Sequence, residues 1–311
     1  MAIQWFPGHM HLTRKAIAER IGEIDVVLEL LDARLPGSSA NPMLAALTIG
    51  KPTVKILNKQ DLADPAQTTA WLAHYNAQAG TQAFGLDASV NAPLQHLRRA
   101  CTELAPTRGA MSKPMRMLIC GIPNVGKSTL INTLTGKRSA KTGDEAGVTR
   151  ITQRITLADG FYLFDTPGVL WPKIAVPQSG FNLAASGAIG KNAYEEIDVA
   201  LALLDYVKTH YAADLVARYA IPVPPHGFVD GDDEELLAAI GRKRAALQAG
   251  NQVNLQKAAE ILIHDFRSGV LGRITLETPA ELALWAAQAQ QAEAERPVKK
   301  QKPQKSSRDV Q

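Results

Sequence analysis

The sequence predicts an α/β fold, with one domain built on a mainly parallel sheet and a smaller all-helical domain after it. Three observations lead to this prediction. Through the first half of the 311 residues, short apolar runs alternate with helix-like stretches. A glycine-containing loop at 121–128 stands between one apolar run and one such stretch. Residues 180–292 are rich in Ala and Leu at helical spacing and contain no clear strand.

The first domain is expected to cover residues 1–175. Its nearly continuous apolar run at 26–31 is typical of a buried parallel strand. The expected strands are 26–31, 53–57, 82–88, 116–120, 151–157 and 161–164. The expected helices are 11–22, 43–49, 65–79, 93–105 and the stretch that follows residue 128. Ligand-binding loops of such a sheet lie at the carboxyl ends of its strands, so the site is expected there.

The second domain is expected at 176–292, with helices near 180–190, 194–219, 232–247, 251–268 and 278–292. A tail at 293–311 follows, and its Lys-, Gln-, Ser- and Pro-rich composition predicts disorder. The lysines of this tail either contact phosphate groups or belong to an ordinary solvated chain end, and the sequence leaves both readings open.

Composition narrows the class of protein. The formal net charge of +4 fits a nucleic-acid partner and an ordinary solvated surface equally well. No apolar run approaches the roughly 20 residues that span a bilayer, and the N-terminal segment lacks the form of a secretion signal. Cys101 and Cys120 are the only cysteines, and Cys120 falls in an expected strand, so we expect a buried residue outside any disulfide. A cytoplasmic protein fits these features.

The loop at 121–128 follows the phosphate-binding pattern G-x-x-x-x-G-K-S. Its glycines let backbone N–H groups close around phosphate oxygens, and the helix that follows presents its positive end to them. Lys127 is expected to reach the β- and γ-phosphates as a catalytic residue, and the Ser128 hydroxyl to bind Mg²⁺. The nucleotide-binding residues expected here are Pro123, Asn124, Val125, Gly126, Lys127, Ser128 and Thr129.

A second motif, Asn58-Lys59-x-Asp61, follows an expected strand and suits a guanine reader. A carboxylate at Asp61 can accept both N–H groups of the guanine Watson–Crick edge, a donor pair that adenine lacks. Asn58 can bond the other edge of the base, and the stem of Lys59 can lie over the ring. A site that hydrogen-bonds a specific edge rejects analogues strongly. On its own, so short a motif also arises by accident.

Two further positions suit the γ-phosphate and its metal ion. Asp165 can hold a water on Mg²⁺, and the Gly168 N–H can meet the γ-phosphate. Thr149 can offer its hydroxyl and carbonyl to Mg²⁺ and the same phosphate, although a lone Thr before a strand is more often structural. Loops held only by a γ-phosphate collapse after hydrolysis, which makes a switch. Together these motifs predict a GTPase that binds and hydrolyses GTP.

The order of the motifs is unusual, because the guanine motif at 58–61 precedes the phosphate loop at 121–128. In most GTPases the phosphate loop comes first. The order predicts a circular permutation, in which one sheet is cut and rejoined at different points. The loop at 165–171 then leads directly into the helical domain, so a change of nucleotide can reorient that domain.

Over roughly residues 1–280 the chain resembles the circularly permuted GTPases, and among them the bacterial ribosome biogenesis GTPase A family. The opening segment and the Trp-Pro pair at 171–172 are the most specific parts of the resemblance. The matching residues are 3–10, 32–34, 38–39, 41–42, 58–61, 121–128, 141–144, 147–149, 165–172, Asp265, Arg267 and 271–273.

The resemblance implies GTP hydrolysis coupled to late maturation of the large ribosomal subunit. It also implies a helical domain that contacts ribosomal RNA, and stimulation of hydrolysis by the ribosome. We expect the protein to be a monomer. Val169 stands where many GTPases place a water-orienting glutamine, and an aliphatic side chain cannot orient water. The family assigns that role to the histidine matching His9, whose imidazole can position water or accept its proton, although a structural role in a turn is the alternative.

The resemblance also carries weaker assignments. Asn124 resembles the asparagine of potassium-stimulated GTPases, so a K⁺ ion is expected there besides Mg²⁺. Ala88 and Ser89 occupy the loop that usually contacts the base, although the family's usual residues there differ. Two other functions stay open. One is a nucleotide-gated RNA-binding module in which hydrolysis is incidental; the other is a membrane-associated GTPase that uses the basic helix at 11–22.

Overall fold

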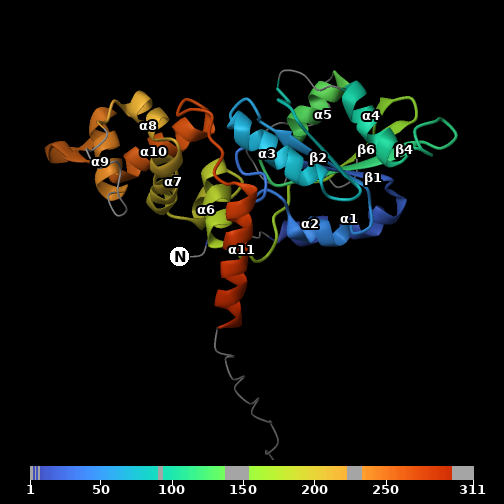
Figure 1. Cartoon of the computed structure of the whole chain (residues 1–311), viewed down its shortest axis with the longest axis horizontal. Coiled ribbons are helices and arrows are strands. Elements are labelled where there is room, and N and C mark those ends of the chain that lie inside the picture. The colour runs from blue at the N-terminus through green and yellow to red at the C-terminus, as the bar shows by residue number, and fades with distance from the viewer. Residues whose placement is uncertain are drawn as a thin grey trace, which may run out of the picture.

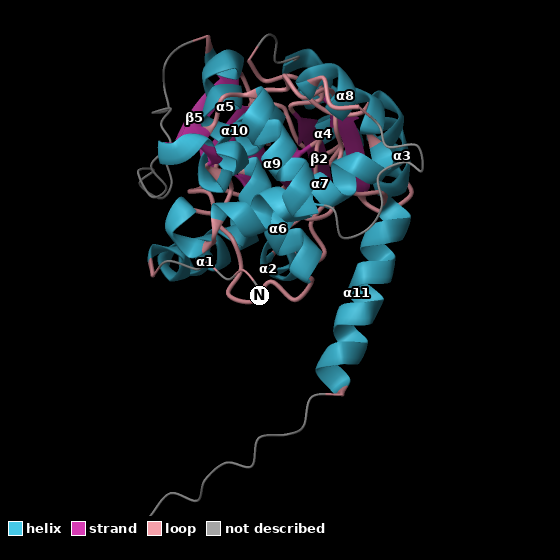
Figure 2. Cartoon of the chain, turned by 90° about the vertical axis from the view of Figure 1, so that its left-hand side faces the viewer, coloured by secondary structure: helices cyan, strands magenta, loops and turns pink. Residues whose placement is uncertain are grey.

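The computed structural model describes Ile3, Trp5 and residues 8–89, 94–136, 154–222 and 233–295. These form two lobes: a sheet lobe, residues 8–165, and a helical lobe, residues 177–267 (Figure 1). The last helix, α11 (Pro279–Ala294), starts between the lobes and projects away from them (Figures 1 and 2). Within the described ranges, no helix is long and apolar enough to cross a membrane.

The sheet lobe contains one six-stranded sheet with the order β3-β2-β1-β4-β6-β5. All neighbouring strands are parallel except β5, which pairs antiparallel with β6, so the predicted mainly parallel α/β sheet is confirmed. The strands are β1 (Val26–Asp32), β2 (Thr53–Asn58), β3 (Thr81–Gly85), β4 (Met115–Gly121), β5 (Arg154–Ala158) and β6 (Phe161–Asp165). The expected strand at 151–157 therefore has its first three residues outside the described part.

Burial follows the apolar runs of the sequence. Every residue of the central strand β1 is buried, as a parallel strand covered on both faces requires. Cys120 in β4 is fully buried and free, as predicted, and Cys101 is buried and free as well. Burial raises the pKa of the Cys101 thiol to about 12, so neither sulfur is exposed as a reactive thiolate.

Five helices cover the sheet: α1 (His9–Arg20), α2 (Pro42–Leu47), α3 (Pro65–Asn76), α4 (Leu94–Leu104) and α5 (Lys127–Thr135). In Figure 1, α1 and α2 lie below the sheet and α4 and α5 lie above it. Helix α1 buries Met10 and Ile17 in the core, so the helix expected at 11–22 is a packed helix of the sheet lobe.

The helical lobe contains α6 (Pro177–Ser186), α7 (Glu196–His210), α8 (Ala212–Tyr219), α9 (Asp233–Lys243) and α10 (Leu255–Arg267) (Figure 2). The single helix expected at 194–219 is wrong, because Tyr211 leaves helical geometry with φ −135° and ψ 38°. Its hydroxyl bonds Asp64 of the sheet lobe and the Thr275 carbonyl, each at 3.1 Å. Two two-residue strands, β7 (Leu247–Gln248) and β8 (Gln252–Val253), form a hairpin too short for a sequence pattern.

A buried carboxylate joins the two lobes. Glu277 has no exposed surface, and its side chain accepts hydrogen bonds from the Ser38 backbone N–H at 2.7 Å and from the Ser38 hydroxyl. On the helical side it accepts one from the Asn182 amide at 3.2 Å. Burial raises the pKa of Glu277, and the surrounding donors act against that shift. The carboxylate therefore ties the loop after β1 to α6.

The segment before α11 also runs back over the sheet lobe. The Ile274 N–H donates to the Leu62 carbonyl, and the Leu276 N–H donates to the Arg34 carbonyl. At the other end of the chain, Ile3 lies against Gly180 of α6. Contacts therefore cross the boundary expected at 175/176, which itself stays a prediction.

We expect Glu277→Ala to lower the free energy of unfolding by about 3 kcal/mol, because it leaves buried donors of Ser38 and Asn182 without an acceptor. Urea unfolding followed by circular dichroism measures the change. The control is Glu260→Ala on the exposed face of α10, which should shift stability by less than about 0.5 kcal/mol. Equal effects of the two substitutions would contradict the assigned junction.

Candidate nucleotide site

The motif residues meet at one edge of the sheet. Asp32, Asn58, Gly121 and Asp165 each end a strand, and the register pairs Asp32 with Asn58 directly. The strands β1, β2, β4 and β6 are parallel, so their carboxyl ends face the same way. The loops that follow them form the site, as expected for a sheet of this type.

Backbone geometry in the phosphate loop explains its glycines. Gly126 has a φ of +101° and immediately precedes α5, and Gly121 has a φ of +156°. A Cβ at Gly121 would lie 2.5 Å from the Leu30 carbonyl, and a Cβ at Gly126 would clash with the Asn58 amide. Asn124, the one non-glycine residue of the loop with positive φ, is of a type that tolerates this region. The loop thus aims the first N–H groups of α5 at the position of an anion.

Two buried opposite charges lie behind this loop. Lys127 is 8% exposed, and burial lowers the pKa of its ammonium group while Asp165 acts against that shift. Asp165 is 5% exposed, and burial raises the pKa of its carboxyl. Its Oδ1 is buried without a hydrogen-bond partner. Buried polar atoms are rarely left unpaired, so this oxygen is poised for a ligand.

The residues at this place fit a magnesium ion. Mg²⁺ keeps several waters and takes few protein oxygens besides substrate phosphates. The Ser128 hydroxyl beside Lys127 could be such a protein oxygen, and the orphaned Asp165 oxygen could accept a hydrogen bond from one of the waters. In the described ranges there is no cluster of three His, Cys, Asp or Glu side chains, so a cage made by the protein alone is not available there. Thr149, the third expected metal ligand, lies outside the described residues.

Asn58 connects three loops of the site. Its amide nitrogen donates to the Val125 carbonyl of the phosphate loop at 2.8 Å, and its oxygen accepts from the Ala88 N–H at 2.9 Å. Each polar atom of the Asn58 amide thus has a partner within the protein, and the expected contact of Asn58 with a base edge stays a prediction. The carboxylate of Asp61 is exposed, as a residue that meets a ligand must be.

The base loop is also tied down from within. The Ser89 N–H and hydroxyl both donate to Asp87, at 2.8 and 2.6 Å. A bound base that took the Ser89 N–H would have to displace Asp87. Thr133 of α5 donates to the Ala88 carbonyl at 2.7 Å, which couples this loop to the phosphate-loop helix. No sequence motif marks Thr133; only its place two turns into α5 points to it.

A buried ionic network supports the guanine motif. The Lys59 ammonium donates to Asp32 and to the Asn124 carbonyl, each at 2.9 Å. Arg34 donates twice to Asp32, at 2.9 and 2.8 Å, and reaches the Phe266 and Arg267 carbonyls of α10. Burial raises the pKa of Asp32, but the two cations outweigh it and hold that pKa below its usual range.

The loop after β6 lies against the phosphate loop. The Val169 N–H donates to the Gly121 carbonyl at 3.1 Å, and the Val169 carbonyl accepts from the Asn41 amide at 2.8 Å. Val169 has no exposed surface, so its side chain points into the core and away from any attacking water. The Leu170 N–H meets the Met10 sulfur at 3.4 Å, which places the start of α1 beside this loop. The His9 side chain lies outside the described part of the structure.

A phosphate loop, a guanine motif and a D-x-x-G loop share one edge of a mainly parallel sheet, in permuted chain order. These features define a circularly permuted P-loop GTPase. Residues 116–225 match the family described as 50S ribosome-binding GTPase. The match begins in the strand before the phosphate loop, so the guanine motif at 58–61 lies before it.

Curated relatives extend the match over most of the chain. Ribosome biogenesis GTPase A of Bacillus cereus is 41% identical over 288 residues, covering 90% of this chain and 95% of the relative. The protein of the same name from Priestia megaterium is 40% identical over 289 residues, covering 90% and 98%. The chain belongs to the ribosome biogenesis GTPase A family and is a GTP hydrolase.

Solved structures share the fold. A GDP-bound structure of YlqF is 23% identical, with a TM-score of 0.58, and covers 85% of this chain and 99% of its own. A GNP-bound YlqF from T. maritima is 24% identical, with a TM-score of 0.57, and covers 86% and 97%. The circularly permuted fold is common to all three.

We expect Gly168→Ala to slow GTP hydrolysis at least about tenfold, equivalent to ~1.4 kcal/mol. A Cβ at Gly168 would lie 2.8 Å from the Cα of Pro123, so the loop after β6 would be forced off the phosphate loop. Single-turnover phosphate release measures the rate. Gly22→Ala is the control, because a Cβ there meets nothing within 4 Å. Unchanged hydrolysis in the Gly168 variant would show that this close approach is dispensable.

Proposed function

We propose that this GTPase acts as a switch in late assembly of the large ribosomal subunit, binding a precursor particle in its GTP state and leaving after hydrolysis. One observation carries the proposal: the loop that begins at Asp165 beside the phosphate loop reaches α6 at Pro177. A change at the γ-phosphate thus acts on the helical lobe through a short connection. The family description and the names of the relatives supply the ribosomal partner.

We assign the nucleotide contacts as follows. Asp61 reads the guanine edge, Lys127 and the N–H groups of residues 124–129 hold the phosphates with Pro123 beside them, and the Gly168 N–H meets the γ-phosphate. Mg²⁺ would be held by Ser128 and Thr149, with Asp165 acting through a water. The Asn124 side chain takes K⁺. Magnesium supplies charge stabilisation on the transferred phosphoryl group.

In the hydrolysis step, water attacks the γ-phosphorus, the bond to the β-bridging oxygen breaks, and GDP and phosphate leave. We assign the positioning of that water to His9. The burial of Val169 supports this assignment, since the residue after D-x-P-G is turned into the core. The contact between Met10 and the Leu170 N–H supports it too, because it brings the start of α1 to the switch loop.

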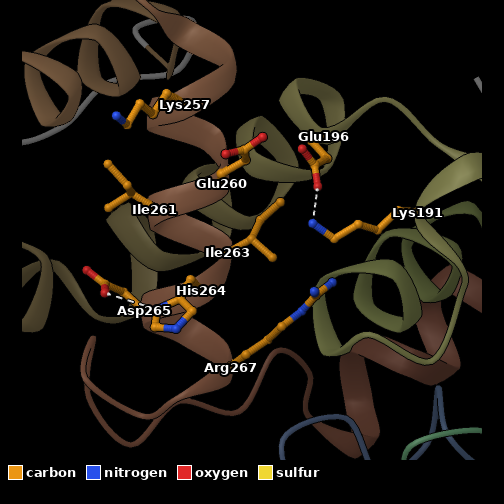
Figure 3. A pocket seen from close by; sticks show the side chains of 9 residues that line it. All are labelled: Lys191, Glu196, Lys257, Glu260, Ile261, Ile263, His264, Asp265 and Arg267. Atoms are coloured by element: carbon orange, nitrogen blue, oxygen red, sulfur yellow. Dashed lines mark ion pairs between the residues drawn. The ribbon is translucent and has the colours of Figure 1, made fainter. Parts of the chain in front are cut away.

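The partner surface is assigned to a helical domain of residues 176–292, which contains the helical lobe. Residues 1–175 are the GTPase domain and 293–311 a basic tail. A groove of about 430 Å³ beside α10 supports contact with ribosomal RNA, because the exposed Lys257 lines it and can meet a phosphate group (Figure 3). Its basic residues are Lys191, Lys257, His264 and Arg267. Acidic residues line it too, so the groove suits a specific contact with one phosphate group better than general attraction of RNA. The protein acts as a cytoplasmic monomer.

Asp61→Asn tests the guanine assignment. An amide presents a donor where the carboxylate had accepted, so we expect the affinity for GDP to fall at least about 100-fold and the affinity for xanthosine diphosphate, which carries a carbonyl at that position, to rise. Fluorescence titration with both nucleotides measures the change. Asp159→Asn, an exposed position at the opposite end of the sheet, should leave both affinities unchanged.

Ribosome co-sedimentation tests the switch. We expect binding to large-subunit precursor particles with a non-hydrolysable GTP analogue and little binding with GDP.

His9→Ala should abolish hydrolysis, retain nucleotide affinity and prevent release from particles. Equal binding in both nucleotide states would overturn the switch. Normal release by the variant would favour an RNA-binding module, and sedimentation with liposomes instead of particles would favour a membrane-associated GTPase.

A further inference from the structure

The phosphate loop contacts the helical lobe directly. The amide nitrogen of Asn124 donates to the Gly187 carbonyl at 2.9 Å, across the boundary between the lobes. The Asn124 carbonyl is held as well, by the Lys59 ammonium at 2.9 Å. Asn124 adopts the left-handed backbone conformation, with φ +56°. Its side-chain amide and its backbone carbonyl are therefore both restrained by groups outside the phosphate loop.

Gly187 is placed by the end of α6. It closes the helix in the left-handed conformation with φ +86°, and its N–H bonds the Ala184 carbonyl. Such an ending leaves carbonyls of the last turn with room for further hydrogen-bond donors. The Arg267 guanidinium takes two of them, donating to the Ala184 and Ala185 carbonyls at 2.7 Å each. A Cβ at Gly187 would lie 3.4 Å from this guanidinium, so the two groups are in close contact.

The backbone of Arg267 links the helical lobe back to the sheet lobe. Its carbonyl accepts from Arg34 at 3.3 Å. Arg34 binds Asp32, and Asp32 binds Lys59, which returns to Asn124. The hydrogen bonds thus form a closed ring through both lobes, with Asn124 at the nucleotide side and Arg267 at the helical side. Figure 3 shows the Arg267 side chain extending away from α10, on the side opposite Asp265.

We propose that Arg267 is a positioning residue for the nucleotide site, which holds the end of α6 so that the Gly187 carbonyl fixes the phosphate loop through Asn124. Nucleotide affinity then depends on how the helical lobe packs against the phosphate loop. By linkage, the factor by which packing of the helical lobe raises nucleotide affinity is also the factor by which bound nucleotide favours that packing. This inference goes beyond the ribosomal role, because it concerns the isolated protein.

Another arginine of the same lobe gives a matched comparison. Arg218 makes a bidentate ion pair with Asp265, at 2.7 and 2.9 Å, and belongs to no part of the ring. We expect its removal to perturb the packing of α8 on α10 and to leave the contact between Asn124 and Gly187 in place. Substituting each arginine in turn therefore distinguishes positioning of the nucleotide site from stabilisation of the helical lobe.

The experiment compares Arg267→Met, Arg267→Lys and Arg218→Met in the full chain, with Asn124→Ala as the partner of a double-mutant cycle. Fluorescent GDP and a fluorescent non-hydrolysable GTP analogue report affinity, and steady-state hydrolysis separates KM from kcat. We expect Arg267→Met to weaken nucleotide binding at least about fivefold and to raise KM more than it lowers kcat. Arg267→Lys should restore part of the affinity, and Arg218→Met should change affinity less than twofold.

The cycle is the decisive part. In the Asn124→Ala background, Arg267→Met should have no further effect on nucleotide affinity. Additive effects, or an equal loss in Arg218→Met, would overturn the proposal. If Arg267→Met does not fold, hydrogen exchange in Asn124→Ala still tests the ring. The amides of residues 187 and 188, which bond α6 carbonyls, should exchange faster than in the unmodified protein, and unchanged exchange would contradict the proposal.

Discussion

The carboxylate of Asp32, buried between the Arg34 guanidinium and the Lys59 ammonium, is the interaction on which the rest of the site depends. It holds the lysine of the guanine motif against the phosphate loop and the arginine against the carbonyl end of α10. Removing one member of such a buried set leaves an unpaired charge and costs about 3–5 kcal/mol. One carboxylate thereby fixes the guanine motif, the phosphate loop and the helical lobe relative to one another.

The permuted chain order explains why these connections meet. Cutting the GTPase sheet after the D-x-P-G loop lets the chain run from Asp165 to α6 with little intervening structure. The same rearrangement brings the end of α6 to Asn124, so the helical lobe is joined to the site covalently and through side chains. Asn41 pins the connecting loop at the Val169 carbonyl. We therefore expect a change of nucleotide to alter how one lobe packs against the other.

Sequence patterns predicted the parts of this structure that are local. The apolar runs predicted the strands, and short motifs predicted the loops at their carboxyl ends, because glycine spacing and strand burial are properties of a few neighbouring residues. Pairings between distant segments could not be predicted: Asn58 with Val125, Arg34 with Phe266, and Asn124 with Gly187. The break at Tyr211 was missed for the same reason, since its partners lie in other parts of the chain. The roles of Thr149 and of the His9 imidazole stay predictions.

The coupling between nucleotide and helical lobe is tested most directly by a distance measurement between the lobes. Cys101 and Cys120 are buried, so spin labels can be placed at Thr102→Cys on α4 and Glu260→Cys on α10, both exposed positions. Pulsed electron paramagnetic resonance then compares the GDP state with the state bound to a non-hydrolysable GTP analogue. We expect the distance distribution to shift between the two states and the shift to shrink in Asn124→Ala. Identical distributions with GDP and the analogue would contradict the coupling.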